Sequence, residues 1–320
     1  MSRWTRRGAV AASACLLIAA GAWSIGAVYY AARGPAWLGS TLAALVLTAI
    51  SACVLLLPWR TEVLSGLGVC GVVLAWWLGL SPSSRRDWEP EYTTAASASR
   101  NGIRILLTNI RNAAYTPAGG IEPRSYDAEY RLDQLDEVDL VSWHWSGGAI
   151  AHVFLSFGFS DGRHVAISVE TRRERGEAYS ALAEFFRRYQ LIYVVADEQD
   201  LIGVRTDIRR ESVYLYRLQT TPAERQALFL SYLDRIAELS AAPEFYNNLV
   251  NNCTTNVLQR ANAASGDIAS SWMALLSGYA DRYAYELGRL NGSLPFETRP
   301  FRSGTFAWIL RGRGTCVDQA

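Results

Sequence analysis

Long apolar runs dominate the first quarter of the chain. Between residues 8 and 81 only Arg33, Arg60 and Glu62 are charged. The runs cover approximately residues 8–31, 37–57 and 63–80, and each is long enough to cross a bilayer core of about 30 Å as a helix. A cleaved signal peptide is the alternative for the first run, but two more runs follow it without a convincing small-residue cleavage motif. The pattern therefore predicts three transmembrane helices within residues 1–80.

The arginines that flank these runs predict their orientation. Three arginines within the first seven residues favour a cytoplasmic N-terminus. Arg60 then falls on the cytoplasmic side, as the positive-inside rule requires, whereas Arg85 and Arg86 fall outside and oppose it. On balance the sequence predicts that everything after about residue 81 lies outside the cytoplasm.

A different pattern begins after the third run. Residues 81–101 are polar and lack an apolar period, which predicts a linker and places the folded domain at residues 102–320. Apolar alternation in β-rich composition predicts strands at residues 103–111, 131–135, 138–145, 190–195 and 212–218. The clearest signal is a hairpin of residues 151–159 and 163–172, joined by the turn Ser160–Asp161–Gly162.

Helical periods alternate with these strands. They predict helices at residues 176–189, 221–239, 252–265 and 281–292, the last ending at Gly292. Thr221, Pro222 and Glu224 form the sequence of a capping box at the start of the second. We therefore expect an α+β domain, with an antiparallel sheet and helices packed on one side, behind the three-helix transmembrane region.

Charge and cysteine content narrow the function. The formal net charge is +1, so no global field favours nucleic acid as a partner. Cys15, Cys53 and Cys70 fall in the apolar runs, which leaves Cys253 and Cys316 in the domain. Their spacing is not that of a metal site or of a disulfide framework, and we expect neither metal nor cofactor. A bridge between Cys253 and Cys316 stays an alternative in an oxidising compartment.

Cys253 is the candidate nucleophile. It lies in the stretch NLVNNCTTNVL, where Asn251 or Asn252 is expected to cap a helix, so the thiol is in the first turn. The helix dipole there favours thiolate, and the free N–H groups can hold an oxyanion. Alternatively Cys253 is a packing side chain. Candidates for holding the oxyanion or positioning substrate are Asn251, Asn252, Thr254 and Tyr246.

A nucleophilic cysteine needs a base, and the three histidines are His144, His152 and His164. With a three-residue turn, His152 lies opposite Glu170 on one face of the hairpin, and His164 lies on that face near the turn. A carboxylate in that position would orient His152 and stabilise its imidazolium. A two-residue turn would instead bring His152 opposite Thr171.

Several ordered motifs carry a family resemblance. AHVFLSFGFSDGRHVAISVETRRERGEAYS, LIYVVADEQDLI, VYLYRL and EFYNNLVNNCTTN resemble the periplasmic domain of the Lnb-type bacterial lipoprotein N-acyltransferases over roughly residues 125–290. The resemblance implies a Cys–His site with Cys253 as nucleophile and His152 as base, and Glu170 matches an acidic position. In that family the membrane part can follow the domain, whereas here the apolar runs precede it.

A looser similarity joins the sequence to lecithin:retinol acyltransferase-like enzymes. Their order of two histidines twelve residues apart and a later cysteine in an NC-containing motif matches His152, His164 and Cys253. After the cysteine the sequences differ, since TTN follows here. This similarity implies a thioester mechanism on phospholipid acyl chains, with His164 rather than Glu170 as the third member.

The two resemblances imply an acyltransferase of the bacterial inner membrane with a papain-like or permuted NlpC/P60-like catalytic domain in the periplasm. A phospholipid or lipoprotein would donate an acyl chain through a Cys253 thioester to the N-terminal amine of a diacylated lipoprotein. The alternatives are a membrane-anchored papain-like peptidase or amidase acting on cell-wall peptide, and a non-enzymatic binding module. The tail FRSGTFAWILRGRG (residues 301–314) is expected either to touch membrane lipids or to pack as a strand.

Overall fold

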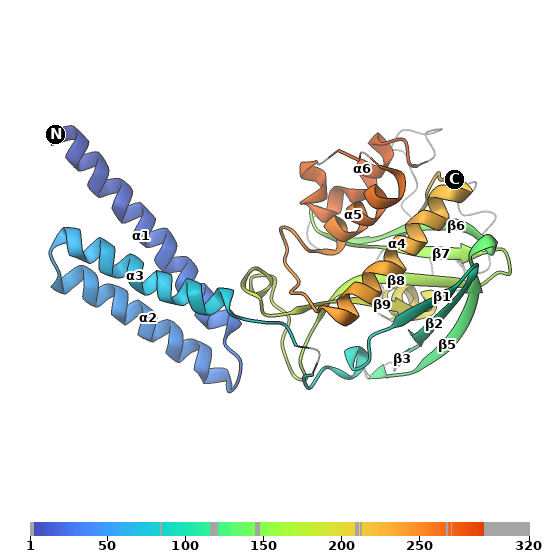
Figure 1. Ribbon diagram of the computed structural model, residues 1–320, viewed down its shortest axis with the longest axis horizontal. Helices are drawn as coiled ribbons and strands as arrows, with labels where there is room; N and C mark the ends of the chain where they lie inside the picture. Colours follow the sequence, from blue (N-terminus) through green and yellow to red (C-terminus); the bar gives the residue numbers. More distant parts are fainter. Residues whose placement is uncertain are drawn as a thin grey trace. The chain divides into compact units, whose positions relative to one another are not determined.

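The computed structural model describes residues 3–83, 85–115, 121–144, 148–208, 211, 213–266, 268–269 and 271–290. Gly292 and the tail of residues 301–314 lie outside this range. The described chain divides into two compact units (Figure 1). One contains the N-terminal helices and residues 178–189, and the other contains the sheet with its helices.

Three long helices form the first unit: α1 (Arg3–Ala31), α2 (Ala36–Leu56) and α3 (Trp59–Leu78). All three are long and apolar enough to span a membrane, over residues Val10–Ala31, Trp37–Leu56 and Thr61–Leu78. Pro35 and Pro58 are the N-caps of α2 and α3, consistent with the preference of proline for helix starts. The three apolar helices indicate membrane anchoring, as the hydropathy pattern predicts.

Residues 178–189 pack against these helices rather than forming the predicted helix of residues 176–189. They contain only the short 3₁₀ turn η3 (Ala183–Phe186), which ends at Arg187 with a φ of 59°. Phe186 stacks on Tyr30 with ring centroids 5.5 Å apart. Arg187 donates to the carbonyl of Trp77 at 3.0 Å, near the carboxyl end of α3, where a cation is favoured. These contacts override the local helical pattern.

An eight-stranded sheet forms the centre of the second unit, in the order β1-β2-β9-β8-β7-β6-β10, with β5 paired to β2. Its strands are β1 (Ser97–Asn101), β2 (Arg104–Arg111), β5 (Ser125–Arg131), β6 (Leu135–His144), β7 (Ala151–Phe159), β8 (His164–Arg172), β9 (Gln190–Ala196) and β10 (Val213–Arg217). A separate pair joins β3 (Ala114–Tyr115) and β4 (Ile121–Glu122). The sheet is mixed, not wholly antiparallel as predicted, because β2 meets β9 in parallel at Arg111 and Ala196.

The predicted linker is partly inside this domain. Ser97–Asn101 forms β1, an edge strand paired with β2. Upstream of it, Trp88 and Tyr92 are buried in the core cluster that includes Phe154 and Ile202. The two aromatic side chains are separated by polar residues, so the sequence shows no apolar period although the segment is anchored.

The two faces of the sheet are covered by different elements. On one face, Phe157 of β7 contacts Phe229 and Tyr232 of α4 (Pro222–Ala241), with ring centroids 5.0 and 5.7 Å away. Helix α5 (Cys253–Ser265) also packs on β7. On the other face, Phe154 belongs to the cluster with Ile202 of the π-helical segment η4 (Gln199–Ile208). Because neighbouring strand residues point to opposite faces, β7 is buried on both sides.

Two further local predictions differ from the structure. The predicted strand of residues 131–135 is mostly the 3₁₀ turn η2 (Leu132–Gln134), which links β5 to β6. The last helix, α6, is short (Ala280–Glu286) and stops before Gly288, whose φ of 69° suits a glycine after a helix end. The Arg289 N–H donates to the Ala284 carbonyl at 2.9 Å and completes this stop.

Candidate active site

Cys253 is the first residue of α5, as the sequence predicts. Asn252 is the N-cap: its side chain accepts from the Thr255 N–H at 2.8 Å, and the Thr255 hydroxyl accepts from the Asn252 N–H at 2.9 Å. This reciprocal pair uses the Thr255 and Asn252 donors and leaves the N–H groups of Cys253 and Thr254 in the first turn. Cys253 itself is 5% exposed.

The thiol lies where β7 and β8 separate. Their ladder runs from the pair Gly158 and His164 to the pair Leu155 and Ile167. Two residues further along β7, the Val153 N–H donates a hydrogen bond to the sulfur of Cys253. The helix start is therefore held against the backbone of β7, next to His152.

The hairpin turn determines which residue faces His152. The Phe159 N–H donates to the Arg163 carbonyl at 2.9 Å, and Gly162, with a φ of 86°, closes a three-residue turn. This is the predicted register with Glu170 opposite His152. Nε2 of His152 lies 3.0 Å from Oε1 of Glu170, so the structure brings the two residues together.

Ser168 contacts both His152 and Glu170, and the sequence analysis did not predict it as a site residue. Its Oγ lies 2.7 Å from Nε2 of His152 and donates to Oε1 of Glu170 at 2.7 Å. Nε2 is thus turned to Ser168 and Glu170, which leaves Nδ1 for the hydrogen bond between His152 and Cys253. The alternation of side chains along a strand would have predicted this role, because Ser168 precedes Glu170 by two residues and therefore lies on the same face of the strand.

The electrostatics of the site favour a thiolate beside an imidazolium. Burial by itself would lower the pKa of His152, but the Glu170 carboxylate and the hydrogen bond to Cys253 raise it to about 10. Burial would raise the pKa of the Cys253 thiol, yet the hydrogen bond and charge of His152 hold it below its usual value. Although burial opposes ionisation of Glu170, the His152 charge lowers its pKa to about 2. His152 and Glu170 therefore favour their charged forms near neutral pH, and the pKa of Cys253 is shifted in the direction that favours thiolate.

The other two histidines lie elsewhere on the sheet. Nε2 of His164 is 2.9 Å from Oε1 of Glu137, at the turn end of the hairpin. His144, at the end of β6, lies edge-on to the Tyr214 ring with centroids 5.4 Å apart, and its Nε2 is 3.8 Å from Asp281. Of the two candidates for a third member, the structure brings Glu170 and not His164 to His152.

The remaining predicted residues surround the thiol. The Asn252 side chain caps α5 and donates to the Asn248 carbonyl at 2.6 Å. Asn251 donates to Glu244 at 3.0 Å and accepts from the Asn256 side chain at 2.9 Å, which fixes the loop before the helix. Both amides therefore have structural partners, and a part in holding an oxyanion stays a prediction.

Thr254 and Tyr246 are both buried. Oγ1 of Thr254 lies 3.9 Å from the Cys253 sulfur, so Thr254 is in direct contact with the candidate nucleophile. Tyr246 belongs to the loop between α4 and α5. A role in positioning substrate stays a prediction for both.

Arg205 is a second residue that sequence reasoning missed. Its guanidinium lies over the Trp143 ring at 3.2 Å, and Trp143 is edge-on to His152 with centroids 5.9 Å apart. The positive charge of Arg205 also contributes to the lowered pKa of Glu170. No motif marks it, because Arg205 lies in the irregular segment η4. Among the described residues, no group of three or more His, Cys, Asp or Glu side chains could hold a metal ion.

Comparison with known proteins identifies a family for this domain. Residues 122–278 match the family described as the Lnb N-terminal periplasmic domain. The matched range contains His152, Ser168, Glu170 and Cys253. No curated protein and no solved structure matches the chain. Residues 122–278 of this protein therefore carry an Lnb N-terminal periplasmic domain.

Proposed function

We propose that this protein is a cysteine-dependent lipoprotein N-acyltransferase. The observation that carries the proposal is the arrangement of the buried Cys253 and His152 with the partly buried Glu170, inside an Lnb-type domain that follows three apolar helices. The thiol of Cys253 at the start of helix α5 faces His152 on strand β7, and this pairing also supports a papain-like or permuted NlpC/P60-like architecture. The helices and the periplasmic character of the family support an inner-membrane, multi-pass protein with this domain in the periplasm.

The first half-reaction forms a thioester. The Cys253 thiolate attacks an ester carbonyl of a phospholipid or lipoprotein, and the N–H groups of Cys253 and Thr254 stabilise the oxyanion. The new S–C bond replaces the C–O bond of the ester, and the departing alkoxide takes its proton from the His152 imidazolium. His152 is then neutral, and Glu170 keeps it oriented through Nε2.

The second half-reaction transfers the acyl chain to an amine. The α-amine of the N-terminal diacylglyceryl cysteine of a lipoprotein attacks the thioester carbonyl and loses a proton to His152. An amide C–N bond forms, the C–S bond breaks, and the thiolate–imidazolium pair is restored. The apolar helices support this chemistry, because tethering the thiol at the membrane raises the effective concentration of both lipid substrates.

Mass spectrometry tests the proposal. Incubated with phospholipid, or with a diacylated lipopeptide whose α-amine is blocked, the full-length protein should gain one fatty-acyl mass on Cys253, which neutral hydroxylamine removes. Cys253→Ala should gain none, and lipoprotein N-termini from cells with this variant should lack the N-acyl chain. Release of cell-wall peptide fragments without any acyl adduct would instead support a peptidase or amidase. N-acylation at the normal rate by Cys253→Ala would overturn the mechanism.

A further inference from the structure

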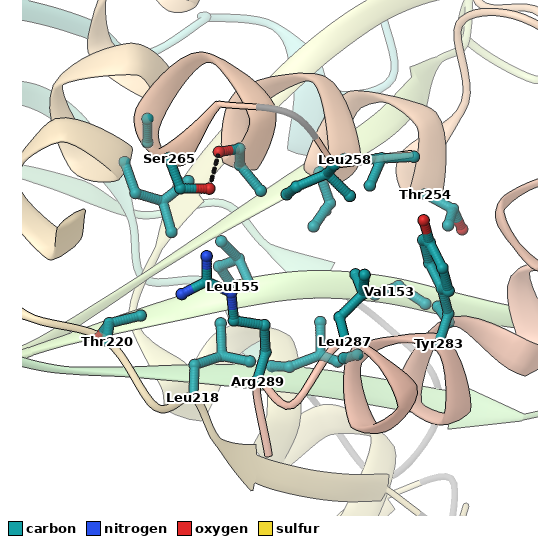
Figure 2. A pocket seen from close by; sticks show the side chains of 18 of the residues that line it. Val153, Leu155, Leu218, Thr220, Thr254, Leu258, Ser265, Tyr283, Leu287 and Arg289 are labelled. Atoms are coloured by element: carbon teal, nitrogen blue, oxygen red, sulfur yellow. Dashed lines mark hydrogen bonds between the residues drawn. The ribbon is translucent and has the colours of Figure 1, made fainter. Parts of the chain in front are cut away.

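An apolar cavity of about 110 Å³ lies beside the candidate active site. It is lined by α4, α5, α6 and the strands β6 and β7, and the lining includes Val153, Leu155, Leu258 and Leu287 (Figure 2). One water-sized group needs at least about 10–15 Å³ of such a cavity, so roughly ten of them fit. The lining is aliphatic over most of its surface, which favours a hydrocarbon ligand over a polar one.

The cavity begins one residue from the thiol. Thr254 lines it, and Oγ1 of Thr254 is 3.9 Å from the Cys253 sulfur. Val153 lines it as well, and the Val153 N–H donates to the same sulfur. Two of the lining residues therefore touch the nucleophile directly, and they come from the two elements that hold it.

The shape of the cavity follows α5. Its lining includes Thr254, Ala261 and Ser265 from successive turns of this helix, and Thr254 and Ser265 lie about 16 Å apart along the axis. Figure 2 shows Thr254 beside Tyr283 at one end and Ser265 towards Arg289 at the other. At that far end Arg289 pairs with Glu224 at 2.8 Å. An apolar space that extends along a helix, with the neighbours of Cys253 at one end and an ion pair at the other, matches a single unbranched chain.

We infer that this cavity is the acyl-chain subsite of the enzyme, and that Ala261 limits the length of the chain it accepts. The inference rests on the proposed acyltransferase function. The carbonyl carbon stays at the Cys253 sulfur, and the hydrocarbon passes Thr254 and lies along α5 between the strand residues Val153 and Leu155 and the α6 side. At Ala261 the small side chain leaves room for the chain to continue towards Ser265.

The inference predicts how the reaction rate depends on the length of the donor's acyl chain. Burial of each methylene contributes about a fourfold gain in affinity, so losing several methylene contacts should lower the rate more than tenfold. Ala261→Phe places a large side chain in the middle of the cavity. Ala263→Phe is the matched control, because Ala263 is on the same helix but exposed and outside the lining.

The first experiment compares acyl donors. Full-length protein is reconstituted in vesicles whose phosphatidylglycerol carries C10, C14 or C16 chains, and thioester formation on Cys253 is followed by intact mass. In Ala261→Phe the rate of thioester formation should fall at least tenfold with the C16 donor and stay unchanged with the C10 donor. Ala263→Phe should show the wild-type rate with every donor. The melting temperature of each variant reports folding. A folded Ala261→Phe with the wild-type chain-length profile overturns the inference.

The second experiment does not depend on catalysis. The Cys253→Ala variant is exposed to palmitate that carries a photoreactive diazirine at its chain end, and crosslinked peptides are mapped. Crosslinks should fall on the α5 and α6 peptides and disappear when Ala261→Phe is added. Such crosslinks without any thioester in the native protein would support the cavity and refute the acyltransferase. A thioester with crosslinks only outside the cavity would support the acyltransferase and refute the subsite.

Discussion

Glu170→Gln tests the electrostatic basis of the site. The change keeps the size of the side chain and removes a charge whose Oε1 lies 3.0 Å from Nε2 of His152. At that distance, with an effective dielectric constant of about 20, the attraction is about 5 kcal/mol, an upper value because Glu170 is 17% exposed and the site relaxes. Opposite charges this close shift a pKa by about 1–3 units, or roughly 1.4–4 kcal/mol.

The pKa shifts of His152 and Cys253 determine the direction of the effect of Glu170→Gln on activity. The Glu170 charge is what raises the pKa of His152 to about 10 against the effect of burial, so Glu170→Gln should lower it. The imidazolium then stabilises the thiolate less, and the pKa of Cys253 should rise. The pH range in which thiolate and imidazolium coexist narrows from both ends. We expect acyl transfer at neutral pH to fall tenfold to thousandfold, about one power of ten per pKa unit.

Iodoacetamide alkylation of Cys253 measures the effect directly. The assay uses full-length protein without its other cysteines and follows the alkylation rate from about pH 5 to 10. Glu170→Gln should move the acidic inflection of the alkylation rate upward by about one pH unit or more relative to the wild type. Glu137→Gln is the matched control, because Glu137 pairs with His164 at 2.9 Å at the other end of the hairpin. An unchanged inflection in Glu170→Gln, or a larger shift in the control, would refute the reasoning.

Three further predictions concern the base and the fold. His152→Ala should lower the acyl-transfer rate by at least about two orders of magnitude, whereas His144→Ala should change this rate little. The reverse ranking in a lipopeptide assay would show that His152 is not the base. Asn256→Ala removes a fully buried amide that bonds Tyr193 at 2.9 Å, and should lower the free energy of unfolding by about 1–3 kcal/mol; an unchanged melting temperature would contradict this. Thr221→Ala breaks the capping box of α4 and should cost about 1 kcal/mol, which Thr221→Ser should largely restore in the same thermal assay.

Some features of this protein follow from the sequence because their causes are local. The hydrophobic runs predict α1, α2 and α3, since about twenty consecutive apolar residues are enough to define each helix. Thr221 and Glu224 predict the start of α4 through a hydrogen-bond exchange over three residues. The Ser160–Asp161–Gly162 sequence predicts the hairpin of β7 and β8 and limits the residue opposite His152 to Glu170 or Thr171, because strand pairing extends from the turn. The observed three-residue turn selects Glu170.

Other features were decided by contacts between distant residues. Residues 178–189 have a helical pattern but pack against α1 and α3, where Phe186 and Arg187 gain ring and carbonyl partners that a helix would not offer them. Residues 97–101 carry too few apolar side chains to predict a strand, yet β2 provides the hydrogen-bond partners that make one. In both segments tertiary partners outweigh a weak local preference.

The site itself depends on both kinds of information. The sequence predicts that Cys253 starts a helix and that His152 lies on a hairpin, but about one hundred residues separate them and no periodicity relates one to the other. Their contact exists because β7 and β8 separate beyond Leu155 and Ile167, and the start of α5 bonds the Val153 N–H beside that opening. The same packing of α5 and α6 over β7 creates the apolar cavity. Cavities arise from the fit of whole surfaces, which local hydrogen bonds and residue periods do not encode.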